Sequence, residues 1–132
     1  MIFYDIQTSI FGTYIVIHSD KGISKLYFST TKPKFPYKKI DIYKSKLDIQ
    51  GTVFQKKVWS ALLKISKGEV KTYSEVARMI GKPKAIRAVA SAIAKNEIGL
   101  LIPCHRVVPS VGGVGKYRWG SERKRKILDA EK

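Results

Sequence analysis

The only cysteine of the chain, Cys104, stands beside residues that are able to activate a thiol. His105 and Arg106 follow it directly, and Pro103 and an apolar run precede it. A thiol is nucleophilic only as the thiolate, and a neighbouring imidazole or guanidinium lowers its pKa. Most free cysteines, however, are inert and behave as small buried hydrophobic residues. The segment therefore predicts either a reactive nucleophile or a structural thiol.

Two further polar residues stand out by their positions. Asn96 is the single asparagine of the chain and lies eight residues before Cys104. Glu131 lies in the last turn of a predicted helix, where a carboxylate opposes the helix dipole and a cation would be preferred. A residue that breaks a local rule can mark a functional position, although a frayed terminus is the simpler explanation.

The composition restricts the class of protein. The 132 residues suffice for one compact unit or one domain with an appendage, and the 26 basic against 10 acidic residues give a net charge of +16. That charge favours a polyanion such as nucleic acid, although thermophilic proteins are also rich in lysine. Few Asn, Gln and Met residues also suggest a thermophilic source. With one cysteine, no membrane-spanning stretch and no signal pattern, we expect a cytoplasmic, nucleoid-associated protein.

The first part of the chain has the alternating pattern of an antiparallel sheet. Ile2–Thr8, Gly12–His18 and Ile23–Ser29 are rich in β-branched and aromatic residues and are separated by short turns. They predict a three-stranded meander, and Thr31–Lys46 is a Pro- and Lys-rich connector. We therefore expect a small β-rich domain with its connector over residues 1–48.

From Gly51 onward the apolar residues follow a helical period. The expected helices are Thr52–Gly68, Thr72–Ile80, Lys84–Lys95 and Ser121–Lys132, the first two beginning with capping boxes. The second and third match a helix-turn-helix pattern, and the basic run in the last is expected to face solvent. The expected fold class is α+β, with a small antiparallel β-sheet domain followed by a mainly helical domain over residues 49–132.

The sequence motifs of this chain, and their order along it, resemble those of the O6-alkylguanine–DNA alkyltransferases, also called methylated-DNA–protein-cysteine methyltransferases. The resemblance covers about residues 51–132. It rests on Gly51–Gln55, Tyr73–Ser74, Lys84–Val89, Asn96 and Ile102–Val107. It implies DNA repair by direct reversal of damage, in which Cys104 accepts an alkyl group from O6 of guanine irreversibly and once per molecule. It implies no cofactor, and the chain lacks the Cys–His cluster that binds zinc in some members.

The resemblance also implies the roles of individual residues. Cys104 would be the nucleophile, His105 would take its proton through a water, Glu131 would polarise the imidazole, and Asn96 would brace the site. The Val107 carbonyl, Tyr117 and Arg118 would line the guanine pocket, and Tyr73 would hydrogen-bond the base. Arg87 would fill the gap left by the flipped base, and Ser74, Lys82 and Ser110 would hold the strand. The implied partner is double-stranded DNA bearing O6-alkylguanine, bound by a monomer through the minor groove with little sequence specificity.

Some residues depart from the family pattern. Glu97 and Gly99 stand where prolines are frequent, so we expect a looser loop there. Arg118 and Trp119 stand where small residues are common beside the pocket, so we expect poorer acceptance of bulky groups such as benzyl. Because Cys104 lies in an apolar segment, we expect alkylation to destabilise the fold. Three other functions remain open: a non-catalytic sensor of alkylated bases, which would typically have Trp in place of Cys104, a helix-turn-helix transcription factor, and a cysteine hydrolase.

Overall fold

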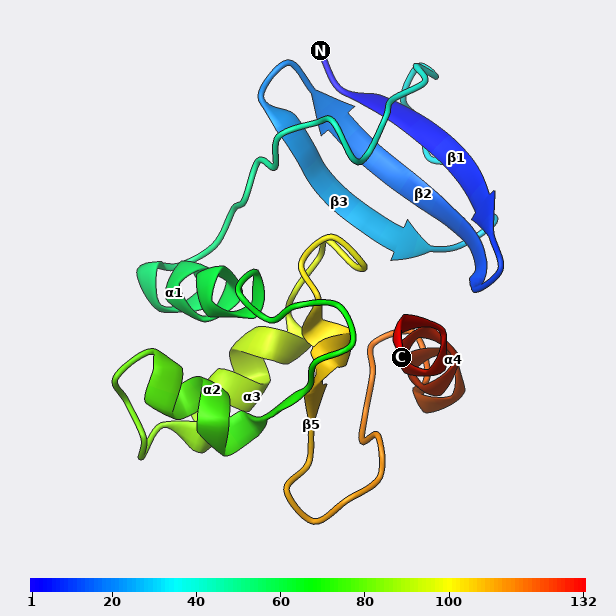
Figure 1. Cartoon of the computed structure of the whole chain (residues 1–132). Coiled ribbons are helices and arrows are strands. Elements are labelled where there is room, and N and C mark those ends of the chain that lie inside the picture. The colour runs from blue at the N-terminus through cyan, green and yellow to red at the C-terminus, as the bar shows by residue number, and fades with distance from the viewer. The chain divides into compact units, whose positions relative to one another are not determined.

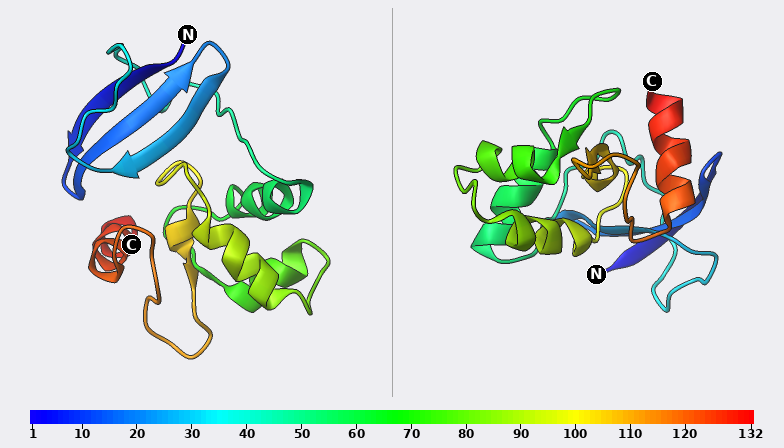
Figure 2. Two further views of the ribbon diagram at one scale, coloured as in Figure 1. Left: turned by 180° about the vertical axis from the view of Figure 1, so that it is seen from behind. Right: turned by 90° about the horizontal axis from the view of Figure 1, so that it is seen from below.

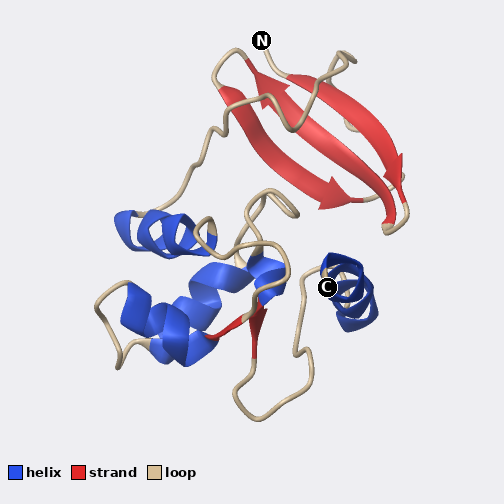
Figure 3. Cartoon of the chain, in the orientation of Figure 1, coloured by secondary structure: helices blue, strands red, loops and turns tan.

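The computed structural model describes residues 1–132 and divides into two compact units (Figure 1). The first contains Met1–Gln50 and Glu97–Gly99, and the second contains Gly51–Asn96 and Leu100–Lys132. A three-stranded antiparallel sheet precedes a mainly helical region, so the expected α+β class is confirmed (Figure 3).

The sheet of the first unit is a meander of β1 (Phe3–Ser9), β2 (Gly12–Ser19) and β3 (Gly22–Phe28), in the order β1-β2-β3. Each strand agrees with its expected range to within one residue at both ends. The central strand β2 pairs on both sides and is buried from Tyr14 to His18, which makes it the core of this unit. A register shift lies between Ile17 and His18.

Two other segments are hydrogen-bonded to this sheet. The connector forms no helix, and it is held by the buried carboxylate of Asp5, which accepts hydrogen bonds from the backbone N–H groups of Ile6 and Ile40. Residues 97–99 lie along β3, because Leu26 donates to the Glu97 carbonyl at 2.9 Å and accepts from the Gly99 N–H at 2.8 Å.

The second unit is built from four helices, one 3-10 turn and two very short parallel strands (Figure 2). These are α1 (Val53–Leu62), β4 (Lys71–Thr72), α2 (Tyr73–Met79), α3 (Ile86–Ala94), η1 (Cys104–Arg106), β5 (Val107–Val108) and α4 (Ser121–Glu131). None of these helices has the length and apolar character needed to cross a bilayer.

Both expected capping boxes are confirmed, but α1 ends at Leu62 and not at Gly68. After Leu62 the chain forms tight turns, in which the N–H groups of Lys64 and Ile65 donate three residues back. These turns still bury Ile65, which is why the apolar pattern continued past the helix.

Helices α2 and α3 form the expected helix-turn-helix, with Gly81 at φ +75° in the turn. Val89 and Ile93 of α3 are buried, and the indole N–H of Trp59 donates to the Ala92 carbonyl at 2.9 Å. This packing fixes α3 while leaving the side chain of Arg87 exposed.

Candidate active site

Cys104 lies at a cavity in the second unit. The side chain is 6% exposed and opens η1, directly after the buried Ile102 and Pro103. The cavity has a volume of about 350 Å³ and is lined by Tyr73, Ala90, Ile93, Ala94, Cys104, Lys116, Tyr117 and Arg118. A thiol is therefore presented to a small, mostly apolar pocket between helix α3 and the loop that precedes α4.

The Cys104 thiol is protonated at neutral pH. Burial raises its pKa, and a hydrogen bond from Asn96 and the positive charges of Lys124 and Arg118 offset only part of that rise. Arg106, one of the two adjacent groups able to lower this pKa, instead binds the carboxylate of Glu131 through its guanidinium. The thiol therefore needs a base before it can act as a nucleophile.

Asn96 fixes the turn that leads into the nucleophile. Its side chain is 1% exposed, and its Nδ2 donates to the Ile102 carbonyl at 3.0 Å. The Asn96 carbonyl accepts a hydrogen bond from Nη1 of Arg118 at 3.1 Å. Asn96 thus lies at the place where a bracing residue was expected, in contact with both the turn and the cavity wall.

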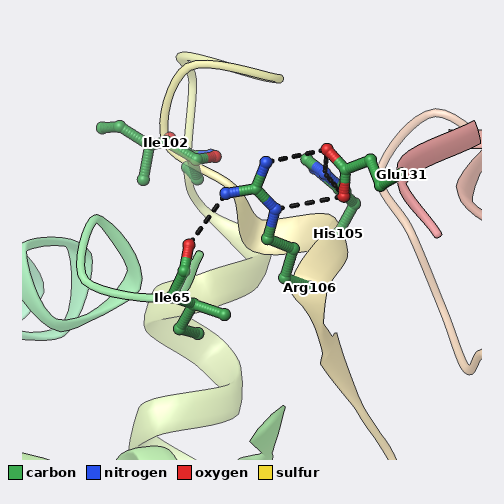
Figure 4. Close-up of polar contacts among 6 residues, drawn as sticks. Ile65, Ile102, His105, Arg106 and Glu131 are labelled. Carbon is green, nitrogen blue, oxygen red and sulfur yellow. Dashed lines mark hydrogen bonds and ion pairs between the residues drawn. The ribbon is translucent and has the colours of Figure 1, made fainter. Parts of the chain in front are cut away.

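His105, Arg106 and Glu131 form one hydrogen-bonded cluster (Figure 4). Nε2 of His105 lies 3.1 Å from each carboxylate oxygen of Glu131. Arg106 binds the same carboxylate in a bidentate manner, at 3.1 Å through Nε and 2.8 Å through Nη2, and donates to the Ile65 carbonyl at 2.8 Å. The partnership of Arg106 with Glu131 was missed from the sequence, although an acid in a basic helix was a signal that a cationic partner existed.

The protonation states of this cluster follow from burial and charge. Burial lowers the pKa of His105 below 6.5, and the neighbouring Glu131 offsets this effect only in part. Burial alone would raise the pKa of Glu131, but hydrogen bonds from Arg106 and the nearby imidazole hold it below 4.5. A neutral imidazole therefore donates its Nε2–H to an ionised carboxylate. Its other nitrogen, Nδ1, is buried without a partner and is free to accept a proton.

Tyrosine side chains frame the cavity. Tyr117 stands edge-on to His105, with ring centroids 6.5 Å apart, and its buried hydroxyl has no partner. Tyr73 begins α2 and lines the same cavity. Arg118 lines it as well, and its guanidinium lies 5.6 Å from the centre of the Trp119 ring.

Other expected site residues lie outside the cavity. Arg87, Lys82 and Ser110 are exposed, and the Ser74 hydroxyl lies 3.1 Å from the Thr72 hydroxyl. Val107 is fully buried and does not line the cavity. The structure therefore places Cys104 in one site with Asn96, His105 and Glu131. Of the expected pocket residues, Tyr73, Tyr117 and Arg118 line the same cavity, whereas the residues expected to hold the strand do not.

The basic run of the last helix is not uniformly solvated, which corrects the sequence expectation. Lys124 is only 1% exposed. Its Nζ donates to the Val107 carbonyl at 2.6 Å and to the Lys116 carbonyl at 3.1 Å. Its neighbours Arg125 and Lys126 are exposed, as expected.

Comparison with known proteins places these features in context. A family model described as "6-O-methylguanine DNA methyltransferase, DNA binding domain" matches residues 53–132. The bifunctional transcriptional activator/DNA repair enzyme Ada of Escherichia coli K12 is 54% identical over 64% of this chain and 24% of its own length. The methylated-DNA–protein-cysteine methyltransferase of Methanosarcina barkeri is 35% identical over 98% of this chain and 97% of its own length.

Solved structures give the same picture for the fold. The crystal structure of Mycobacterium tuberculosis O6-methylguanine methyltransferase matches with a TM-score of 0.88 at 30% identity, over 99% of this chain and 93% of that chain. The M. tuberculosis OGT in complex with DNA matches with a TM-score of 0.87 at 31% identity, over 97% of this chain and 91% of that chain. The first curated relatives are longer than the match, which spans 24% of the first two and 57% of the third.

Proposed function

The chain belongs to the 6-O-methylguanine DNA methyltransferase family, and on this premise we propose that it repairs DNA by moving an alkyl group from O6 of guanine to Cys104. The observation that carries the proposal is a buried thiol at a cavity, next to an imidazole whose Nδ1 has no partner. A thiol held neutral by burial and a neutral base beside it are the two reactants of a proton transfer.

The first step is the activation of the thiol. The proton of Cys104 passes through a water molecule to Nδ1 of His105, while Nε2–H remains donated to Glu131. The carboxylate stabilises the imidazolium that forms, and Arg106 keeps that carboxylate ionised and oriented. Asn96 holds the turn before the nucleophile through the Ile102 carbonyl.

The second step is displacement at a saturated carbon. The sulfur bonds to the alkyl carbon as the bond from that carbon to O6 breaks, and the electron pair goes to the guanine. The proton that His105 took from the thiol is then returned to the guanine anion, so that neutral guanine is released and the imidazole is neutral again. The product on Cys104 is a thioether, which water does not hydrolyse, so each protein molecule reacts once. A cysteine hydrolase would instead form a thioester and turn over.

The remaining site residues would hold the substrate. The base leaves the stack to reach a buried thiol. Tyr117 and Arg118 would contact it in the cavity, with Tyr73 as a hydrogen-bonding group. The family resemblance also assigns the Val107 carbonyl to the base, but Val107 is fully buried here, so it would have to become exposed for this contact. The exposed Arg87 would fill the gap in the duplex, and Ser74, Lys82 and Ser110 would hold the strand without reading its sequence.

The proposed partner is double-stranded DNA bearing O6-alkylguanine, bound by a monomer through the minor groove in the cytoplasm, at the nucleoid. The net charge of +16 and the relative crystallised with DNA support this partner. We propose in addition that residues 49–132 form the domain that binds DNA and carries out the transfer, and that residues 1–48 form a separate domain.

Intact mass spectrometry tests the function directly. The protein is incubated with an excess of duplex containing O6-methylguanine, beside Cys104→Ser as the control. Wild type should gain the mass of one methyl group, saturating at one per molecule, and the serine variant should gain none. Tight binding to the lesion without any gain would contradict transfer and would indicate a sensor, and repeated turnover would indicate a hydrolase.

A further inference from the structure

Lys124 is the largest fully buried side chain of the protein, although it carries a positive charge. Removing an ammonium group from water is unfavourable unless its donors are satisfied. Both hydrogen-bond acceptors are backbone carbonyls, those of Val107 at 2.6 Å and Lys116 at 3.1 Å. Burial lowers the pKa of Lys124 to about 8, and the nearby Cys104 offsets only part of that change. Burying this ammonium group therefore costs desolvation free energy, which indicates that Lys124 has a role in the site.

The two carbonyls belong to two different segments, one that follows the nucleophile and one that lines the cavity. Val107 begins β5, immediately after the turn that carries Cys104. Lys116 opens the segment Lys116–Arg118, which lines the cavity. The ammonium group of Lys124 therefore connects the Cys104–Val107 segment, which carries the nucleophile, to the Lys116–Arg118 segment, which lines the pocket.

The loop between these two segments is closed at its base by further contacts. Gly115 has φ +76°, and a Cβ atom there would lie 2.7 Å from Cγ of Pro109, so the two ends of the loop approach closely. The hydroxyl of Ser121 donates to the Gly115 carbonyl at 2.8 Å. Ser121 and Lys124 are three residues apart in the first turn of α4, so this turn holds the base of the loop at two points.

Helix α4 also supports His105, the proposed general base of the reaction. Lys124, Ile127 and Glu131 follow the spacing of one helical face, and the first two are buried. The same helix thus holds the pocket wall through Lys124 and the imidazole of His105 through Glu131. Both supports are fixed relative to each other by the rigidity of the helix.

We propose that Lys124 is a positioning residue for alkyl transfer, which holds the Lys116–Arg118 wall at a fixed spacing from the Cys104–Val107 segment. This inference rests on the proposed function. Without the ammonium, the buried Val107 carbonyl and the Lys116 carbonyl lose their donor, and the Lys116–Arg118 segment is free to shift away from the thiol. The flipped base would then be held less often in the geometry that allows attack, which lowers the rate of transfer more than the affinity for DNA.

The test compares Lys124→Met, which keeps the length of the side chain, with Lys126→Met, which removes the same charge from an exposed position of the same helix. Transfer from the O6-methylguanine duplex is followed by intact mass over a range of DNA concentrations. We expect the rate constant at saturating DNA to fall at least tenfold for Lys124→Met and to stay within twofold of wild type for Lys126→Met. Half-saturating DNA concentrations should match between the variants. Equal rate constants in two folded variants would overturn the proposal.

A second measurement needs no variant, in case Lys124→Met does not fold. Backbone 15N relaxation of the wild-type protein should give order parameters for Lys116–Arg118 as high as those of α4, and lower values for the exposed loop tip at Val111–Gly113. Order parameters at Lys116–Arg118 as low as those of the loop tip would overturn the proposal that Lys124 holds this segment in a fixed position. A wild-type protein that gains no methyl group would instead contradict the proposed function. The relaxation data would still test whether the Lys116–Arg118 segment is held rigidly.

Discussion

Nε2 of His105 lies 3.1 Å from both carboxylate oxygens of Glu131, which comes 26 residues later in the chain. Arg106 binds the same two oxygens from another direction. The carboxylate is therefore held ionised by a permanent cation while the imidazole beside it stays neutral. This arrangement gives a reason for a carboxylate in the last turn of α4, where the helix dipole disfavours it.

Replacing Glu131 should slow the transfer. In Glu131→Gln the amide keeps the size of the side chain but cannot stabilise an imidazolium or pair with the Arg106 guanidinium. We expect the rate constant for transfer to fall by about 10- to 100-fold, as for the loss of a group that supports a general base. Asp129→Asn is the matched control, because that carboxylate is exposed and pairs only with Lys132 at 3.3 Å. Equal rate constants for the two variants would remove Glu131 from the mechanism.

The pH dependence of transfer should report His105. Its pKa is lowered from 6.5 by burial, so the neutral base persists at and below neutral pH. We expect a rate constant that falls on the acid side with a midpoint below pH 6.5, as the imidazole becomes protonated. Single-turnover rates in constant-ionic-strength buffers measure this, with His105→Gln as the variant that should lose the acidic limb. A midpoint above 6.5 would contradict a buried, neutral imidazole.

The same shift has a consequence for stability. Since the folded-state pKa of His105 lies below its unfolded value, the unfolded chain binds more protons in the acidic range. The contribution to the free energy of unfolding is therefore present above pH 6.5 and is lost as the pH falls through the folded-state value. Urea unfolding of wild type and His105→Gln between pH 7 and 5 should show a steeper loss for wild type.

Features with a local signal were predictable from the sequence. The capping pairs Thr52–Gln55 and Thr72–Glu75 each lie within four residues, and both form as expected. The strands follow from alternation, and the reactive segment around Cys104 follows from its residue types. The pairing of β4 with β5 has no such signal, because each strand contains only two residues.

Features that depend on the direction of a side chain were not predictable in the same way. Adjacency suggested that Arg106 serves the thiol, but consecutive residues of a 3-10 turn point in different directions, and its guanidinium reaches Glu131. The charge run of α4 suggested a solvated face for Lys124. Its helical spacing from the apolar Ile127 was the signal that this lysine lies on the buried side. The thermophilic source suggested by composition stays a prediction.

Arg118 should limit the size of the alkyl group. Its guanidinium donates to the Asn96 carbonyl at 3.1 Å while the residue lines the cavity, so the side chain occupies space beside the thiol. In Arg118→Ser we expect the rate with O6-benzylguanine to rise at least threefold relative to the rate with O6-methylguanine DNA. Arg125→Ser, at an exposed position, serves as the control. An unchanged ratio would show that this side chain moves aside at no cost.

Arg87 should matter for duplex DNA and not for a free base. The exposed side chain on α3 would fill the space that the flipped nucleotide leaves, and unstacking costs a few kcal/mol. In Arg87→Ala we expect transfer from the duplex to slow by about tenfold. Reaction with free O6-benzylguanine should stay within twofold of wild type. Lys57→Ala, on α1, controls for the loss of one exposed positive charge, and equal slowing with both substrates would place Arg87 in the pocket instead.

Alkylation of Cys104 should destabilise the fold. The thiol is 6% exposed, and it accepts a hydrogen bond from Asn96 that a bulkier thioether would strain. Overpacking of this kind typically costs about 1–3 kcal/mol, which corresponds to a fall in melting temperature of at least about 3 °C for a protein of this size. Differential scanning calorimetry of wild type before and after methylation, with the DNA removed, measures the shift. Cys104→Ser carried through the same treatment should show none, and equal melting temperatures for free and methylated wild type would show that the site already has room for the product.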